Sequence, residues 1–158
     1  MRGINRSHLV SRSESKFAKV KKAQTSDGLE GAIGGNFWRV QDVLKNQRLP
    51  PDDIVKFIYL AEGPNLTTDI AFARDEVPLH LHRKHDELIH ILEGSGTFRV
   101  GKSFYKFGPQ SIIYIPEDTV HGGKLDGEIK ILSVYTPKFD IRKPDRIFVD
   151  ENGKPITM

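Results

Sequence analysis

Short apolar runs separated by turn-forming residues dominate the chain from residue 54 onward. The runs are rich in β-branched and aromatic residues, and Gly, Pro, Asn or Asp stands in most of the gaps between them. This pattern is typical of β-strands joined by tight turns. It predicts strands at 54–60, 67–73, 88–92, 96–100, 103–107, 111–115 and 129–135, with a tight hairpin at 100–104 around Gly101.

Helical signals are few. Val40, Val43 and Leu44 would share one face of a short helical turn at 40–45, and Leu49-Pro50-Pro51 would end it because proline cannot continue the hydrogen-bond ladder. Many close strands with little helix favour an antiparallel sandwich or barrel. The sequence shows no internal repeat, so we expect one barrel and not a tandem pair.

The 158 residues are enough for one domain with a buried core. We expect residues 1–30 to form a basic, partly flexible N-terminal arm, and residues 31–158 to form a single β-barrel domain with a C-terminal tail. Phe139 and Phe148 are aromatic anchors in that tail, which we expect to wrap the outside of the barrel.

The net charge of +3 is unevenly distributed. Residues 1–22 carry seven basic and one acidic side chain, or +6, which leaves −3 for the rest. A nucleic-acid-binding domain would carry its bases on the folded face, so we expect no nucleic-acid partner. For the arm three alternatives stay open: a solvated tail, a contact with a polyanion or membrane surface, or an edge strand exchanged with a partner subunit.

No apolar run approaches the roughly 18 to 20 residues that span a bilayer, so we expect no membrane association. The polar, basic N-terminus is unlike a secretory signal. The sequence contains no cysteine, which excludes disulfides, thiolate zinc sites and a cysteine nucleophile and is consistent with a cytoplasmic location.

Five of the six histidines lie between residues 80 and 121. His80 and His82 are two residues apart, so on a strand both imidazoles would point to the same side. After a polar bend, alternation on a strand at 87–93 would place Glu87, Ile89 and Ile91 on one face. If strands 78–82 and 87–93 form a hairpin, the two imidazoles and the carboxylate converge.

Two imidazoles and a carboxylate form a facial ligand set that suits non-haem Fe(II), Mn(II) and related divalent ions. A third imidazole is available at His121, which follows a short loop after the strand at 111–115. That loop could bring His121 back over the mouth of the barrel.

These segments resemble the two motifs of the cupin family. Residues 78–94, PLHLHRKHDELIHILEG, match H-x-H-x(3,4)-E-x6-G, and residues 116–121, PEDTVH, match the core of P-x-G-x-x-H. The resemblance covers roughly residues 54–137. It implies a double-stranded β-helix (the cupin jelly-roll barrel, an all-β fold) and a single divalent metal ion per chain (Fe, Mn, Ni or Zn), with these ligands: His80, His82, Glu87 and His121.

The sequence departs from the family pattern at loop positions that are not ligands. The glycine that often opens the first motif would fall at Arg74, and the one that opens the second would fall at Gln110. The glycine within P-x-G is Asp118, and an asparagine sometimes found after the last histidine would fall at Leu125. These changes bear on loop conformation and leave the ligand set intact.

Other side chains are weaker candidates. We expect His85 to be an exposed loop histidine, although it could be an alternative ligand, and His90 to pack between sheets or at a subunit contact; His8 lies in the arm. Candidate pocket residues are Phe72, Ile89, Arg99, Tyr114 and Tyr135, although for Arg99 a surface ion pair, and for the tyrosines ordinary core packing, are the alternatives.

Two functions remain. The first is a metalloenzyme of the dioxygenase or isomerase kind, acting on a small polar molecule that chelates the metal, with Glu87 as a candidate base. The second is a non-catalytic module that binds or senses a small molecule. Because small cupins often pair through a sheet face or an edge strand, we also expect a homodimer.

Overall fold

The β-rich runs of the sequence become two antiparallel sheets that face each other. The computed structural model describes residues 36–140 and 142–157. Within these residues the chain forms one short helix, α2, which is Val40–Asn46, and ten strands. The strands are β1 (Val55–Glu62), β2 (Thr67–Ala73), β3 (Glu76–Leu81), β4 (Asp86–Glu93), β5 (Gly96–Val100), β6 (Ser103–Phe107), β7 (Ile112–Ile115), β8 (His121–Leu125), β9 (Ile129–Thr136) and β10 (Ile147–Phe148).

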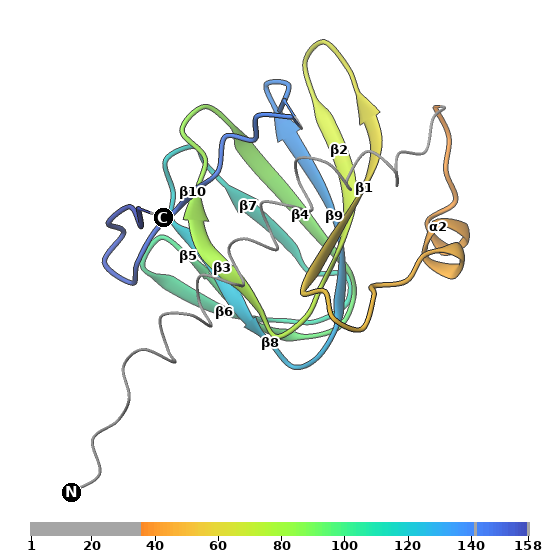
Figure 1. The fold of residues 1–158 in the computed structure, drawn as a ribbon, viewed down its shortest axis with the longest axis horizontal. Coiled ribbons are helices and arrows are strands. Elements are labelled where there is room, and N and C mark those ends of the chain that lie inside the picture. Colours follow the sequence, from red (N-terminus) through yellow and green to blue (C-terminus); the bar gives the residue numbers. More distant parts are fainter. Residues whose placement is uncertain (1–35, 141, 158) are drawn as a thin grey trace, which may run out of the picture.

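One sheet has the strand order β1-β2-β9-β4-β7, and the other has the order β10-β3-β8-β5-β6. Strands that follow each other along the chain often lie in opposite sheets, so the chain winds around a common interior (Figure 1). This is the all-β jelly-roll barrel that the motifs implied. The helical turn and the β5–β6 hairpin around Gly101 are also confirmed.

One expectation about the strands is wrong. Strands β3 and β4 do not form a hairpin, because β3 pairs with β8 and β10 whereas β4 pairs with β7 and β9. His121 follows the short loop that comes after β7 and is the first residue of β8. Strand β8 was not predicted, because Gly122 and Gly123 follow His121 directly and glycine is depleted in strands.

Those glycines let the backbones in the second sheet approach closely. A Cβ on Gly122 would lie 2.6 Å from the carbonyl oxygen of Val77 in β3, and a Cβ on Gly123 would lie 2.6 Å from that of Thr97 in β5. No ordinary side chain fits at either position. The pair therefore holds β8, and with it His121, against both neighbouring strands.

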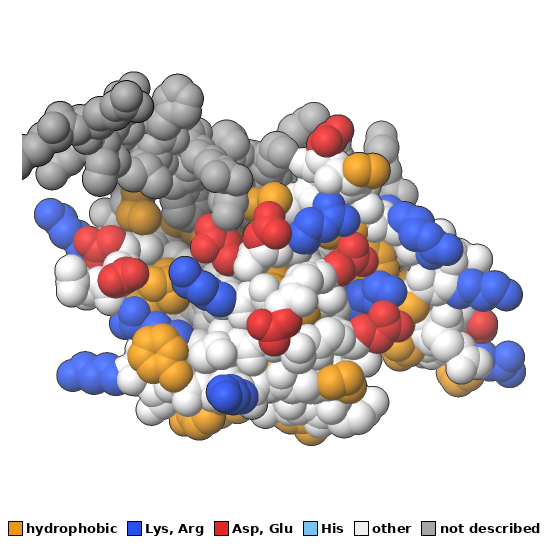
Figure 2. Space-filling model, turned by 90° about the horizontal axis from the view of Figure 1, so that it is seen from below, with side chains coloured by type: hydrophobic (Ala, Val, Ile, Leu, Met, Phe, Trp, Pro, Cys, Tyr) orange, Lys and Arg blue, Asp and Glu red, His pale blue; other side chains and the backbone are white. Residues whose placement is uncertain are grey.

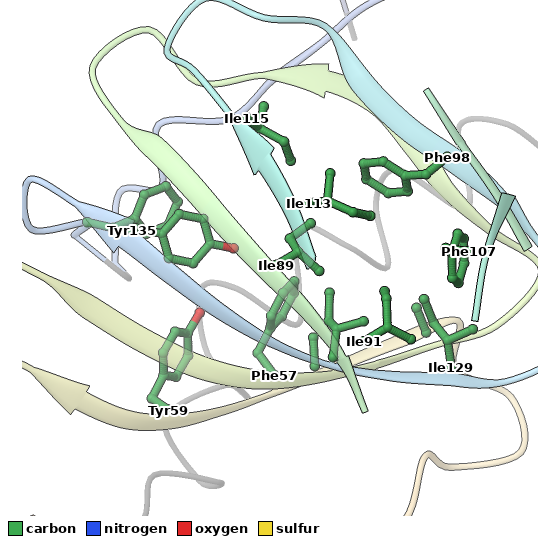
Figure 3. Close-up of a cluster of buried hydrophobic side chains, with 14 residues drawn as sticks. Phe57, Tyr59, Ile89, Ile91, Phe98, Phe107, Ile113, Ile115, Ile129 and Tyr135 are labelled. Atoms are coloured by element: carbon green, nitrogen blue, oxygen red, sulfur yellow. The ribbon is translucent and has the colours of Figure 1, made fainter. Parts of the chain in front are cut away.

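The main core lies between the two sheets. Strand β4 alternates as predicted, with Glu87, Ile89 and Ile91 buried and with Leu88 exposed. The inward-facing side chains of both sheets meet in one cluster, which includes Ile89, Ile91, Phe98 and Phe107 (Figure 3). This apolar interior fills the space between the two sheets.

A second apolar cluster covers the outer face of the first sheet. Val43 of α2 and Leu49 pack with Ile58, Ile70 and Phe72, all of which point out of the barrel. The helix thus closes a sheet face that would otherwise be an exposed apolar surface.

No helix in residues 36–140 and 142–157 combines the length and the apolar character that crossing a membrane requires. On the face shown in Figure 2, Lys and Arg side chains lie among Asp and Glu side chains, with single apolar side chains between them. That face carries no continuous field of one charge.

Candidate metal centre

Strands from both sheets bring together the four side chains His80, His82, Glu87 and His121. His80 lies near the end of β3, and His82 follows the last residue of that strand. His121 pairs directly with His80 across the β3–β8 ladder. Glu87 comes from β4 in the opposite sheet, so the site bridges the two sheets.

The four side chains are close enough to share one ion. Their candidate ligand atoms all lie within 4.8 Å of one another. The Nε2 atoms of His82 and His121 lie 3.2 Å and 3.1 Å from the same carboxylate oxygen, Oε2 of Glu87. All four residues are buried, with 1–5% of their surface exposed.

Backbone carbonyls fix the orientation of all three imidazoles. The Nδ1 atom of His80 donates to the Pro78 carbonyl at 2.7 Å, and that of His121 donates to the Thr119 carbonyl at 2.8 Å. The Nδ1 atom of His82 donates to the carbonyl of Asp145. A carbonyl oxygen only accepts, so each Nδ1 carries a hydrogen and each neutral ring presents the lone pair of Nε2. A hydrogen bond from the ring nitrogen that faces away from the metal typically orients a histidine ligand.

The electrostatics of the cluster favour a bound cation. Burial lowers the pKa of His80 and of His82, in the case of His80 well below its ordinary value, so protonation of these rings is disfavoured at neutral pH. Burial alone would raise the pKa of Glu87, but the adjoining His121 and His82 rings outweigh burial and hold that pKa well below the usual value. Converging lone pairs and a carboxylate repel one another unless a positive charge lies among them. The donor set therefore fits a divalent metal ion.

A cavity of about 60 Å³ lies in the barrel interior next to the cluster. His80, Glu87 and His121 form part of its wall, whereas most of the remaining wall is apolar. Since roughly 10–15 Å³ is enough for one water molecule on the same measure, the space suits a molecule of only a few heavy atoms.

The structure places the predicted pocket residues in two groups. Ile89 and Tyr135 line the cavity. Phe72, Arg99 and Tyr114 do not, so for these three the prediction is wrong. Phe72 faces the outer apolar cluster, because it occupies the opposite alternation of β2 from Ala71 and Ala73, which do line the cavity.

Arg99 and Tyr114 lie on the outside of the barrel. The Arg99 guanidinium donates to the carbonyls of Gly101 and Glu151. Tyr114 is 57% exposed, and its hydroxyl donates to Asp86 at 2.8 Å. Neither side chain reaches the cluster of three histidines and Glu87.

The two remaining described histidines are not part of the cluster. His85, expected to be exposed, is buried: its Nδ1 lies 2.8 Å from the Asp145 carboxylate and its Nε2 lies 3.0 Å from the Lys138 carbonyl. His90 is half-buried on the outer side of β4, where Nε2 lies 2.8 Å from Oε1 of Gln110. His8 lies outside the described residues.

Sequence reasoning missed the contribution of the C-terminal tail. The tail does not simply wrap the exterior, because Phe139 belongs to the main core and stacks against Tyr135, with ring centroids 4.5 Å apart. The Asp145 carboxylate accepts hydrogen bonds from the Lys84 amide and from His85. The backbone carbonyl of Asp145 orients His82, and Arg146 lines the cavity. The strand-like run Ile147-Phe148-Val149 directly after Asp145 and Arg146 is the one local signal that could have placed them at the barrel.

The fold and the site can now be compared with known proteins. The profile of the family described as "Cupin domain" (Cupin_2) matches residues 70–135, which include all four cluster residues. The chain is a small member of the cupin superfamily.

Relatives of this cupin are distant. An uncharacterized protein of Aquifex aeolicus (strain VF5) is 26% identical over 110 residues, which cover 68% of this chain and 89% of that protein. An uncharacterized conserved protein with a double-stranded β-helix domain from Klebsiella pneumoniae superposes with a TM-score of 0.60 at 13% identity, covering 74% of this chain and 99% of the other. KdgF from Halomonas sp. superposes with a TM-score of 0.56 at 17% identity, covering 67% of this chain and 96% of the other. Likenesses at these identities establish the fold alone.

The departures from the cupin motifs have a simple structural basis. Gln110 and Asp118, which stand where the family often has glycine, both keep a left-handed backbone, with φ of 70° and 58°. The Asp118 amide donates to the His82 carbonyl at 2.7 Å, so this turn helps to hold His82 in place. Near Arg74 the left-handed residue is the following one, Asp75, with φ of 69°. The loops thus retain a left-handed residue at or beside each of the three positions where the family often has glycine.

Proposed function

We propose that this cupin binds one divalent first-row metal ion through His80, His82, Glu87 and His121, and that it acts as a metalloenzyme on a small oxygen-bearing molecule. The observation that carries the proposal is the orientation of the three imidazoles. Each Nδ1 is committed to a backbone carbonyl, and each Nε2 is therefore left for an ion. Iron, manganese, nickel and zinc all suit three imidazoles and one carboxylate.

The chain's own residues would bind and orient the reactants. A bound ion of this class supplies Lewis-acid or redox chemistry at a substrate oxygen. The apolar wall of the cavity excludes water and limits the size of the substrate. Glu87 is the cluster's carboxylate and the candidate base; its depressed pKa keeps it ionised, which suits a ligand at neutral pH.

Metal analysis of a ligand variant tests the proposal. In His121→Ala the donor set loses one imidazole, so the ion-to-chain ratio after dialysis should fall from about one to well below that of the unmodified protein. His90→Ala is the matched control, because His90 lies on the outer side of the barrel and its removal should leave the ratio unchanged. A His121→Ala protein that keeps its full ion would contradict the proposed ligand set.

Turnover separates the enzyme from a non-catalytic binding module. Metal-loaded protein should consume oxygen or convert a substrate when it is screened against small diketones, catechols, amino-acid thiols and keto-sugars. Saturable binding in calorimetry without turnover would instead support the module.

We also propose that the chain forms a homodimer. Leu88, Ile112 and Tyr114 are 42%, 68% and 57% exposed on the outer face of β4 and β7, where Leu88 pairs with Tyr114. Strand β7 is an edge strand, and exposed apolar edges are typical of subunit contacts. Residence in the cytoplasm stays a prediction.

A further inference from the structure

Three buried polar atoms near the cluster have no partner and no role in holding a metal. They are Oγ of Ser133, Oδ1 of Asp69 and Nε of Arg146, none of which has a hydrogen-bond partner among the described residues. Buried polar atoms are nearly always paired, so several unpaired ones close together are typical of a site for a ligand.

The register of the first sheet places two of these residues next to Glu87. Asp69 pairs with Tyr59 on one side and with Ser133 on the other, and Ser133 pairs with Ile89. Glu87 is two residues from Ile89 on the same face of β4, so this row directly adjoins the row of the metal cluster. Figure 3 shows the hydroxyl groups of Tyr59 and Tyr135 pointing toward each other in this region, from β1 and β9.

Arg146 enters the same space from the tail. Its guanidinium lies 5.2 Å from the centre of the Phe57 ring, and Nη2 lies 3.4 Å from the Tyr135 hydroxyl. None of the ion pairs found within the described part of the chain includes Arg146, and Asp69 does not approach it within 4.0 Å. A guanidinium that lines an apolar cavity without a carboxylate partner is suited to an anionic ligand.

The rest of the cavity defines the other end of such a ligand. Ser133 and Arg146 line the cavity together with apolar side chains, among them Phe57, Ile89 and Ile131. With about 60 Å³ available, the ligand has few heavy atoms. The planar guanidinium of Arg146 and the single hydroxyl of Ser133 match a carboxylate better than a phosphate, which normally requires more hydrogen-bond donors.

We propose that Arg146 and Ser133 bind the carboxylate of a small aliphatic 2-oxo or 2-hydroxy acid. The second oxygen of this ligand, the keto or hydroxyl oxygen on carbon 2, faces His80, Glu87 and His121. This inference rests on the proposed metal function, because the second oxygen is the atom that a metal ion would take. The apolar wall receives the aliphatic chain.

Calorimetry with a charged and an uncharged probe tests the inference. We use 2-oxoisovalerate and its methyl ester with manganese-loaded full-length protein. The acid should bind at least about tenfold more tightly than the ester, and Arg146→Gln should weaken acid binding by about 10- to 100-fold, the range for a charge-assisted hydrogen bond, with ester binding unchanged. Arg83→Gln is the control, because Arg83 is exposed and pairs with Asp118.

Two outcomes overturn the inference. One is equal binding of acid and ester by the unmodified protein; the other is an Arg146→Gln protein with normal melting and metal content that still prefers the acid. If Arg146→Gln does not fold, Ser133→Ala decides: a loss of acid affinity of about fivefold or more supports the site, and unchanged affinity refutes it.

The metal content is measured separately in every sample, which separates this inference from the proposed function. A chain that takes up no ion contradicts the proposed function. The two probes are then compared on metal-free protein, where a preference for the acid that depends on Arg146 still supports the carboxylate site and its absence refutes it.

Discussion

At the scale of single residues, backbone conformation explains substitutions that the motifs alone left open. Gln110 and Asp118 are left-handed residues at positions where the family often has glycine. Side chains other than glycine, asparagine and aspartate adopt this conformation at a cost of about 1–2 kcal/mol. Gln110 compensates in part through its hydrogen bond with His90.

A pair of variants at Gln110 checks this explanation. Both Gln110→Gly and Gln110→Ala remove the side-chain amide, but only glycine removes the left-handed strain, so the glycine variant should be more stable by about 1 kcal/mol in urea unfolding. At Lys106, an exposed residue of β6, the order should reverse because glycine weakens a strand. An alanine variant as stable as glycine at Gln110 would contradict the explanation.

Asp69 gives the protein a pH dependence that can be calculated. Burial, together with the nearby charge of Glu87, raises the pKa of Asp69 to about 8. Between about pH 4 and pH 8 the folded chain therefore keeps a proton that the unfolded chain has lost. Stability is complete below this window and falls as the pH rises through it, by up to about 1.4 kcal/mol per pH unit.

Asp69→Asn removes the titrating carboxyl group and should therefore reduce the fall in stability between about pH 4 and pH 8. Urea unfolding of the metal-free variant and of the unmodified chain at pH 5, 6, 7 and 8 measures the difference in slope. Equal slopes would show that Asp69 is ionised in the folded protein, and that its burial has no effect on stability in this range.

At the scale of elements, the C-terminal tail holds the cluster of His80, His82, Glu87 and His121 from outside the strands. The hydroxyl of Thr67 in β2 both donates to the Phe139 carbonyl and accepts from the Phe139 amide, at 3.0 Å each. Further along, hydrogen bonds from His85 and from two backbone amides outweigh burial and lower the pKa of Asp145. The tail is thus held at two points and presents the Asp145 carbonyl to His82.

Asp145→Asn should weaken metal binding although Asp145 is not a ligand. Loss of the carboxylate loosens the contacts with Lys84 and His85, so the carbonyl no longer holds His82, and outer-shell changes of this kind typically cost 10- to 100-fold in metal affinity. Competition with a chelator measures that affinity. Asp140→Asn, an exposed change in the same tail, should have no effect. Equal metal affinities in the two variants would show that the Asp145 carboxylate does not help to hold His82 for metal binding.

Features that depend on neighbouring residues could be predicted from the sequence, whereas features that depend on distant strands could not. Strand β2 was predicted from its run of β-forming residues and the alternation of β4 from its period-two pattern, because both signals are properties of one strand alone. The ligand set was proposed from residue spacing and motif resemblance. The β3–β4 hairpin was wrong because the sheet to which a strand belongs is decided by distant partners, β8 and β9. Asp145 and Arg146 were missed for the same reason, since Asp145 lies 63 residues after His82.

At the scale of the whole molecule, the first sheet has two different outer regions. The α2 helix covers one, whereas Leu88, Ile112 and Tyr114 leave the region near β7 exposed. Ile112→Asp should convert a dimer into a monomer, because a charge there would be buried without a partner in the interface. Phe104→Asp, equally exposed at 68% but on the other sheet, should not. Sedimentation checks both; a monomeric unmodified chain would contradict the proposed dimer.

The most direct test of the central claim is a crystal structure of the metal-loaded protein with anomalous diffraction at the absorption edge of the bound metal. We predict one anomalous peak per chain, within coordination distance of Nε2 of His80, His82 and His121 and of the Glu87 carboxylate. A peak elsewhere, or no peak among these four side chains in protein that carries a full complement of metal, would contradict the claim.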